Sequence, residues 1–360
     1  AGLINRKQNK IATQFHPEVS HTEEGGQLLK NFIFKIAKCE KNWTPSNFIQ
    51  DQVKKIKEKS GDENILVGVS GGVDSTVMAC LINKSVGNKC TAVLIDHGLL
   101  RKAEAKNCVN ALKNGLGIDV HLFDESKLFF SRLKGVIDPE QKRKIIGDQF
   151  IKSFYRIAGK FGNYKFLGQG TLYPDIIESG VSASKSAHVI KSHHNVGGLP
   201  DDLEFGLIEP LKDLFKDEVR AVGKQLGISN ELIFRHPFPG PGLGVRVIGE
   251  VTKDRVSILQ EADHIYMEVL KKTGEYDNIW QAFAVLVPVK TVGVMGDQRT
   301  YENLVALRAV TSVDGMTADW YKMPSDVLSE ISSNIVNNVK GVNRVVYDVT
   351  SKPPGTIEWE

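Results

Sequence analysis

The sequence contains little cysteine and no long apolar run. Only four of its 360 residues are cysteine (Cys39, Cys80, Cys90 and Cys108), and their spacing fits neither a metal site nor a redox pair. Two of them lie in apolar runs, where a thiol behaves as a small hydrophobic side chain. This usage predicts a reduced, intracellular setting. No run is long enough to cross a membrane and the polar, basic N-terminus lacks a signal peptide, so we expect a cytoplasmic protein without a membrane partner.

The sequence also lacks an excess of either sign of charge. The chain has 46 basic and 43 acidic residues and a net charge of +3, whereas a dedicated nucleic-acid binder concentrates basic residues on one face. We therefore expect no nucleic-acid partner. There is no internal repeat and no low-complexity tract. Hydrophobic residues make up 41% of the chain, which is ordinary for a globular protein, and its length allows two domains or more.

The most specific feature present is the string Ser-Gly-Gly-Val-Asp-Ser at residues 70–75. It follows the apolar run at 65–69 and precedes the apolar run at 76–82. This order predicts a buried strand, a tight turn and a helix. Such a turn brings backbone N–H groups and a helix N-terminus to one point, which suits a phosphate or pyrophosphate.

Most residues of this string suit the binding of an anion, whereas Asp74 carries a negative charge itself. Gly71 and Gly72 let the backbone approach an anion, and Ser70 and Ser75 add hydroxyl donors. Asp74 would be repelled by bound phosphates unless a cation lay between them, so we assign it to Mg²⁺. A capped helix after a glycine turn would explain two glycines alone, but the whole six-residue string is more specific.

Strand and helix patterns alternate after this string. Residues 91–95 and 120–123 predict two further buried strands, with a helix at 103–116 between them, as in a parallel sheet with right-handed crossovers. Ligands of such sheets bind beyond the carboxyl ends of the strands, where the string at 70–75 and the turn at 96–98 both fall. We expect a ligand against the strand end at Leu94.

Two charged clusters follow in predicted helices. A helix at 139–161 carries Lys142, Arg143 and Lys144 near its start, which indicates either a nearby anion or a solvated basic face. Asp175 and Glu178 are three residues apart, so on a helical turn they share a face and could bind one Mg²⁺ together with Asp74. A pair of acids in the first turn of any helix would look the same.

Residues 180–203 are rich in serine, lysine, glycine and histidine and show little periodicity. Long loops in a compact domain are usually functional or disordered. We expect a cationic lid that carries Lys191, His193 and His194 and closes over bound phosphates.

The C-terminal third shows a different pattern. A proline- and glycine-rich crossover at 235–244 precedes predicted strands and helices of a small α+β domain. The predicted strands lie at 245–251, 282–287, 292–295 and 344–349, and the helices at 254–272 and 325–339. The last ten residues contain two prolines, an isoleucine and a tryptophan, so we expect this tail to be held in place.

The N-terminal segment contains His16-Pro17-Glu18 at the end of a predicted strand, followed by an amphipathic helix. It resembles the tail of a class I glutamine amidotransferase. The resemblance implies that His16 is a general base oriented by Glu18. None of the four cysteines has the Gly-x-Cys-x-Gly surroundings of that family's nucleophile. We therefore expect most of the glutaminase domain to be missing from this sequence, and the chain as given not to hydrolyse glutamine.

Several stretches together resemble the GMP synthetase family, a branch of the N-type ATP pyrophosphatases, which split ATP between its α- and β-phosphates. The string at 70–75 is similar to the pyrophosphate loop of all those enzymes. The closer resemblance is carried by residues 70–75, 190–200, 236–244, 280–283, 296–301 and 352–360. It covers the full chain and implies an α/β fold, with a parallel-sheet ATP pyrophosphatase domain of the adenine nucleotide alpha hydrolase type and a small C-terminal α+β dimerisation domain. The implied boundaries are 1–40 for the amidotransferase remnant, 45–236 for the ATP pyrophosphatase and 237–360 for dimerisation and XMP binding.

The resemblance also implies a reaction and its residues. A carbon–nitrogen ligase would aminate XMP to GMP through adenylyl-XMP, with ammonia normally from glutamine, Mg²⁺ as cofactor and a homodimer as the assembly. The implied ATP-binding residues are Ser70, Gly71, Gly72, Val73, Asp74, Ser75, Thr76 and Leu94, with the adenine ring against the strand end at Leu94. The implied catalytic role of Lys191, His193 and His194 is to stabilise the charge at the reacting phosphate. The implied XMP-binding residues are Arg143, Gln281, Lys352, Ile357 and Glu358. A tRNA-thiolating pyrophosphatase is the alternative, but it would need a reactive cysteine pair and a basic RNA face, and the sequence shows neither.

Overall fold

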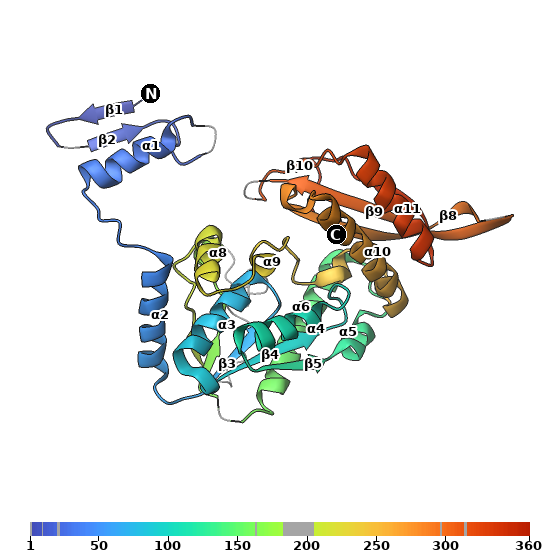
Figure 1. Ribbon diagram of the computed structural model, residues 1–360, viewed down its shortest axis with the longest axis horizontal. Coiled ribbons are helices and arrows are strands. Elements are labelled where there is room, and N and C mark those ends of the chain that lie inside the picture. Colours follow the sequence, from blue (N-terminus) through green and yellow to red (C-terminus); the bar gives the residue numbers. More distant parts are fainter. Residues whose placement is uncertain are drawn as a thin grey trace. The chain divides into compact units, whose positions relative to one another are not determined.

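The computed structural model describes residues 2–8, 10–19, 22–162, 164–182, 205–295, 297–312 and 315–360. The chain forms two compact units, Ala1–Phe48 and Ile49–Glu360 (Figure 1). Among the described residues, no helix has both the length and the apolar character that a membrane crossing requires.

The first unit is a hairpin followed by a helical segment. Strands β1 (Gly2–Asn5) and β2 (Lys10–Thr13) pair antiparallel, and α1 (Gly25–Lys30) continues into a π-helical stretch (Asn31–Ile36). The predicted strand and amphipathic helix are therefore present. Their apolar side chains stay exposed, because a unit this small has no sheet large enough to cover them. The exposed set includes Leu3, Ile4, Ile11, Phe15, Leu28, Phe32, Ile33 and Ile36.

A five-stranded parallel sheet organises the second unit. Its strand order is β5-β4-β3-β6-β7. The strands are β3 (Ile65–Val69), β4 (Cys90–Asp96), β5 (Val120–Asp124), β6 (Phe166–Gly168) and β7 (Gly206–Ile208). The chain moves outward on one side from β3 to β5, then returns to the other side of β3 with β6. The direction in which successive strands are added therefore reverses between β3 and β6. Open α/β sheets bind ligands at the carboxyl ends of the two strands at such a point.

Helices cover this sheet and follow the predicted alternation. They are α2 (Pro45–Ser60), α3 (Val73–Val86), α4 (Glu104–Asn110), α5 (Ser126–Leu133), α6 (Pro139–Ala158), α7 (Tyr173–Ser182), α8 (Lys216–Gln225) and α9 (Asn230–Ile233). Gly168 in β6 shows how closely they pack. A Cβ on Gly168 would lie 2.5 Å from Val67 Cγ1 and 2.6 Å from Ile82 Cδ1, so only glycine lets β6 lie against β3 and α3.

The second sheet belongs to the C-terminal part. Strand β9 (Gln298–Thr311) pairs antiparallel with β8 (Gln281–Met295) and β10 (Asp319–Trp320), and parallel with β11 (Val342–Tyr347). Helices α10 (Lys253–Thr273) and α11 (Ser325–Asn338) pack together and contact this sheet. An apolar core runs without interruption from Leu66 of the first sheet to Ile335 of α11.

Of the strands of this part, one prediction was wrong, two predicted strands are joined into one, and one strand was missed. The predicted strand at 245–251 is a 3₁₀ turn (Gly242–Val245) followed by a single bridge from Val247 to Leu286. The two short strands at 282–287 and 292–295 are one strand, β8, because the irregular pairing between Val287 and Thr291 accommodates Pro288. β9 was missed altogether, since its charged and polar first half does not alternate like a half-buried strand.

Two buried histidines, His97 and His236, serve as hydrogen-bond acceptors within the fold. Nδ1 of His97 accepts from Leu99 N at 3.1 Å, and Nδ1 of His236 accepts from Ala282 N at 3.2 Å. The other ring nitrogen of His236 donates to Tyr276 O at 2.9 Å. Burial lowers the pKa of each histidine from 6.5 to about 4, so both rings are neutral near pH 7.

These pKa values predict a loss of stability in mild acid. Between pH 6.5 and 4 the unfolded chain protonates both histidines while the folded chain does not, so the free energy of unfolding should fall as pH falls through this window. Each histidine contributes a slope of about 1.4 kcal/mol per pH unit. Denaturant titrations at pH 7 and pH 5 measure it. The slope should be smaller in His97→Asn, and equal slopes in both proteins would contradict the assignment.

Candidate functional site

The loop at residues 70–75 is folded onto the start of α3 by its own hydroxyl groups. Ser75 Oγ donates to Gly72 O at 3.0 Å and accepts from Ser70 N at 3.2 Å. Thr76 Oγ1 also donates to Gly72 O, at 2.9 Å. Gly71 has a φ of +77°, a left-handed conformation that favours glycine. The predicted strand, tight turn and helix are confirmed.

The first turn of α3 presents backbone donors. Its N-cap is Gly72, which has no side chain to accept a capping hydrogen bond. The N–H groups of Val73 and Asp74 lie in the first turn, where no carbonyl of the helix can pair with them. Together with the positive end of the helix dipole they form a site for an anion.

Asp74 lies in that first turn and contacts a residue that sequence reasoning missed. Its Oδ2 is 2.5 Å from Nζ of Lys216, at the start of α8. Its Oδ1 is buried and has no hydrogen-bond partner among the described residues. Gly170 lies close by, since a Cβ there would be 3.5 Å from the backbone of Asp74 and Ser75. A buried carboxylate oxygen that lacks a donor is a fitting ligand for a divalent cation.

The other proposed metal ligands are placed differently. Asp175 Oδ2 accepts from Leu172 N at 2.9 Å and so caps the start of α7. The side chain of Glu178 lies outside the described part of the structure. Within the described ranges, no group of three histidine, cysteine, aspartate or glutamate side chains could hold a metal ion. Asp74 is therefore the one predicted ligand whose surroundings support the assignment.

The side chains of Leu94 and Thr76 are buried. Each residue is 1% exposed. Leu94 is on β4, which has a strand on either side, so its side chain lies in the interior. An adenine ring against this strand end stays a prediction, and it would meet the backbone of Leu94 rather than its side chain.

Two of the predicted XMP residues meet at the C-terminal tail. Gln281 Nε2 donates to Glu358 Oε1 at 2.9 Å. Glu358 also forms a two-pronged ion pair with Arg246, at 3.0 and 2.8 Å. The Arg246 guanidinium is fully buried, and it lies over the rings of Phe283 (4.0 Å) and Phe238 (5.1 Å). Arg246 was not predicted, because its partner lies 112 residues away in the sequence.

The basic start of α6 faces the last residue of the sequence. Nζ of Lys142 pairs with the Glu360 carboxylate and donates to Val247 O at 2.8 Å, and Arg143 donates to the Glu360 carbonyl. Lys142 is fully buried whereas Lys144 is exposed. The sequence left two interpretations of this basic cluster, a nearby anion or a solvated face. Lys142 lies next to an anion, the Glu360 carboxylate, whereas Lys144 lies on a solvated face.

Lys352 and Ile357 hold the tail from the other side. Lys352 Nζ donates to Gly315 O at 2.8 Å, and its backbone pairs with Ala318. Ile357 is buried against Phe283 and Val285. The tail is thus held in place, as predicted. Arg308, also fully buried, donates to the carbonyls of Thr350 and Thr356.

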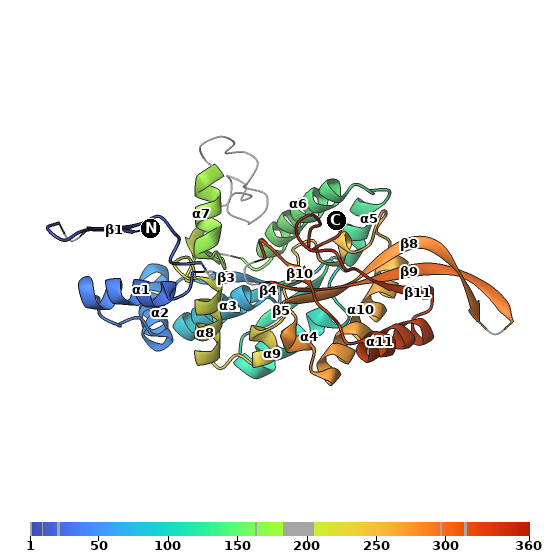
Figure 2. The ribbon, with the colours of Figure 1, turned by 90° about the horizontal axis from the view of Figure 1, so that it is seen from above.

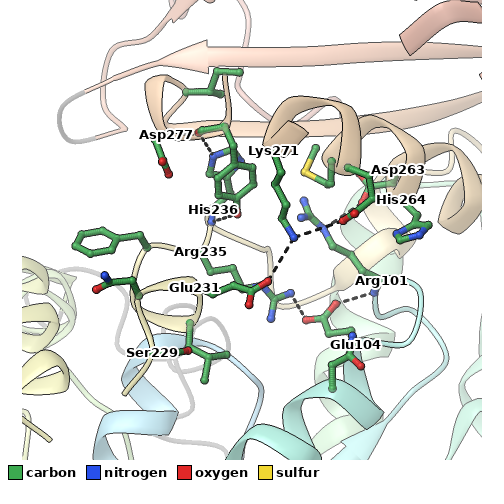
Figure 3. A pocket seen from close by; sticks show the side chains of 18 of the residues that line it. Arg101, Glu104, Ser229, Glu231, Arg235, His236, Asp263, His264, Lys271 and Asp277 are labelled. Atoms are coloured by element: carbon green, nitrogen blue, oxygen red, sulfur yellow. Dashed lines mark hydrogen bonds and ion pairs between the residues drawn. The ribbon is translucent and has the colours of Figure 1, made fainter. Parts of the chain in front are cut away.

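A cavity of about 1140 Å³ lies behind the loop (Figure 3). Its walls come from α4, α9, α10 and the crossover, and they carry Arg101, Glu104, Arg235, His236, Asp263 and Lys271. No residue of 70–75 lines it, so the cavity is distinct from the predicted ATP site. Arg235 and Cys108 line the cavity and also contact Gly71.

Cys108 is a buried thiol, and we expect Cys108→Ser to leave the reaction intact. Burial raises its pKa from 9.0 to about 11, so the nucleophilic thiolate is scarce at neutral pH. The rate of AMP formation should stay within about twofold, as for a packing change without chemistry. A loss of activity in this variant, measured beside Cys80→Ser, would favour the thiolation alternative.

The predicted base and its orienting carboxylate do meet in the first unit. His16 Nδ1 lies 2.8 Å from Glu18 Oε1, and both side chains are exposed. Hydrogen bonds from its own backbone and from His16 lower the pKa of Glu18. The predicted lid residues Lys191, His193 and His194 lie outside the described residues.

Three family models match separate parts of the chain. The PP-loop domain family matches residues 45–124, the GMP synthase C terminal domain family residues 268–359, and the class-I glutamine amidotransferase family residues 1–36. The solved NMN synthetase from Francisella tularensis aligns with 66% of this chain and 94% of its own, at 15% identity and a TM-score of 0.42.

Two curated relatives match over 360 residues, which is all of this chain and 70% of each relative. The GMP synthase (glutamine-hydrolyzing) of Carboxydothermus hydrogenoformans is 55% identical, and that of Brachyspira hyodysenteriae is 54% identical. Identity at this level over all 360 residues, covering 70% of each relative, shows that the chain belongs to the GMP synthase family.

Proposed function

We propose that the chain aminates XMP to GMP at the expense of ATP, with AMP and pyrophosphate as products. The observation that carries the proposal is the loop at 70–75. Its helix start has no side-chain cap, it lies where the strand order of the sheet reverses, and Oδ1 of Asp74 is buried there without a partner among the described residues. Membership of the GMP synthase family supplies the substrates. The alternative in the same superfamily, tRNA thiolation, is disfavoured because Cys80, Cys90 and Cys108 are buried.

The proposed chemistry is an adenylyl transfer followed by a displacement. The C2 oxygen of XMP attacks the α-phosphorus of ATP, and the bond to the β-phosphate breaks, releasing pyrophosphate. Ammonia then attacks C2, and AMP leaves with the oxygen. The loop's N–H groups and the hydroxyls of Ser70 and Ser75 would hold the departing pyrophosphate. Asp74 would hold Mg²⁺, which neutralises phosphate charge, and Lys216 would then be released to contact the phosphates.

The proposed XMP site lies at the tail. Arg246 holds the Glu358 carboxylate in one orientation, and Gln281 donates to it, so the group that would accept from the nucleotide is preorganised. Arg143 and Lys352 would bind the 5′-phosphate after exchanging their present carbonyl partners on Glu360 and Gly315. Ile357 anchors this segment in the core.

We propose that the second unit divides functionally near residue 237, and that its C-terminal part forms a homodimer. The distal part of β8 and β9 pairs only with itself, since β11 pairs with β9 from Asn303 onward. This ribbon projects from the sheet (Figure 2) and exposes Val289, Val292, Val294 and Tyr301. Exposed apolar side chains on a two-stranded ribbon are expected at an interface between copies.

AMP release measured with XMP, ATP and Mg²⁺ tests the function. We expect residues 1–360 to release AMP and form GMP when ammonium is present, and to form none when glutamine replaces ammonium. His16 and Glu18 would serve glutamine hydrolysis only beside a cysteine nucleophile, which residues 1–360 do not supply. AMP release that needs tRNA instead of XMP would support thiolation. Glutamine-driven turnover would contradict the expectation that residues 1–360 supply no nucleophile for glutamine hydrolysis.

A further inference from the structure

Arg235 holds the pyrophosphate loop from behind. Its Nη1 donates to Gly71 O at 3.2 Å, and its Nη2 pairs with Glu104 across the cavity wall (Figure 3). The fit is close, because a Cβ on Gly71 would lie 3.3 Å from Arg235 Nη1 and 3.4 Å from Cys108 Sγ. The guanidinium therefore occupies a fixed place directly behind the peptide that joins Gly71 to Gly72.

This hydrogen bond determines where the next N–H group points. In a trans peptide the C=O and N–H bonds lie on opposite sides. With Gly71 O directed at Arg235, the N–H of Gly72 is directed away from it, where Ser70 Oγ accepts at 3.4 Å. So long a hydrogen bond is weak and easily exchanged for a phosphate oxygen. A cation on the carbonyl also polarises the peptide and strengthens its N–H as a donor.

The surroundings of Arg235 suit a positioning role better than direct anion binding. Its charge is offset by the buried Glu104, whose second oxygen accepts from Arg101 N at 2.7 Å. The guanidinium also lies 5.8 Å from the centre of the Phe238 ring. These contacts fix the group in place before any ligand binds. None of the mechanism described above uses Arg235.

We propose that Arg235 is a positioning residue that sets the Gly71–Gly72 peptide, so that Gly72 N–H faces the departing pyrophosphate. The inference rests on the proposed function of the loop. The crossover at residues 235–244 would thus help to bind the departing pyrophosphate.

Binding of pyrophosphate with Mg²⁺, measured by calorimetry on the whole protein, tests the proposal. Arg235→Met should bind pyrophosphate about tenfold more weakly, as expected for loss of one charge-assisted hydrogen bond. Arg235→Lys should recover part of that affinity. The dissociation constant of XMP should change little. The unfolding midpoint should fall, because the buried Glu104 loses its ion-pair partner. The matched control is Arg220→Met, because Arg220 lines the same cavity, lies over the Phe234 ring and has no described contact with the loop.

Two results would overturn the proposal in different ways. Unchanged pyrophosphate binding in Arg235→Met, or equal losses of affinity for pyrophosphate and XMP, would make Arg235 a structural brace only. Failure of the unaltered protein to bind pyrophosphate would instead remove the proposed function of the loop, and the role of Arg235 with it.

Discussion

Asp74→Ala should abolish AMP formation while leaving the protein folded. The substitution removes the one buried carboxylate oxygen at the loop that lacks a donor, and with it the group proposed to hold the cation between protein and phosphates. A loss of about 10³-fold in kcat is expected when a group that stabilises charge at the reacting centre is removed. Stability should change little, because the ion-pair partner Lys216 is about half exposed and can be solvated.

The control for this experiment is Asp217→Ala. Asp217 is an exposed acid that follows Lys216 in the first turn of α8, so its removal changes the charge near the loop without touching it. It should retain full AMP formation and an unchanged unfolding midpoint. Asp74→Ala with more than a tenth of the normal rate would show that the carboxylate has no part in the reaction. Equal losses in both variants would point to a general effect of charge.

Glu358→Ala should both destabilise the fold and remove XMP use. Arg246 is fully buried, and Glu358 is the only carboxylate among the described residues within ion-pair distance of it. Deleting one member of a buried pair leaves an uncompensated charge, at a cost of about 3–5 kcal/mol in the free energy of unfolding. Denaturant titration measures this loss, and the KM for XMP in the ammonium assay measures the second effect.

A double variant separates the two roles of Glu358. Adding Arg246→Met removes the stranded charge and should restore much of the stability, because an apolar side chain suits a site between Phe238 and Phe283. XMP use should stay lost, since Glu358 is still absent. Restored XMP use in the double variant would contradict the proposed contact between Glu358 and the nucleotide. Normal stability in Glu358→Ala would contradict the pairing.

The local elements near the loop could be predicted from sequence because their causes are local. The apolar run at 65–69, the paired glycines and the apolar run that follows determine strand, turn and helix within about twenty residues. The left-handed φ of Gly71 needs a glycine at that position. The alternation after β3 indicated the parallel sheet for the same reason. The long strand β9 escaped prediction because pairing on both sides, and not its own alternation, makes it a strand.

The pairings of charged side chains were decided by tertiary structure alone. Lys216 reaches Asp74, Arg246 reaches Glu358 and Arg235 reaches Gly71, across separations of 142, 112 and 164 residues. Composition and periodicity do not encode such partners, because each pair forms only where two elements are packed side by side. Burial likewise left the backbone of Leu94, and not its side chain, at the end of β4. The sequence by itself therefore determined the anion loop and its chemistry. The fold decided that Oδ1 of Asp74 lacks a partner among the described residues beside that loop, and that Arg235 holds the loop and Arg246 the tail.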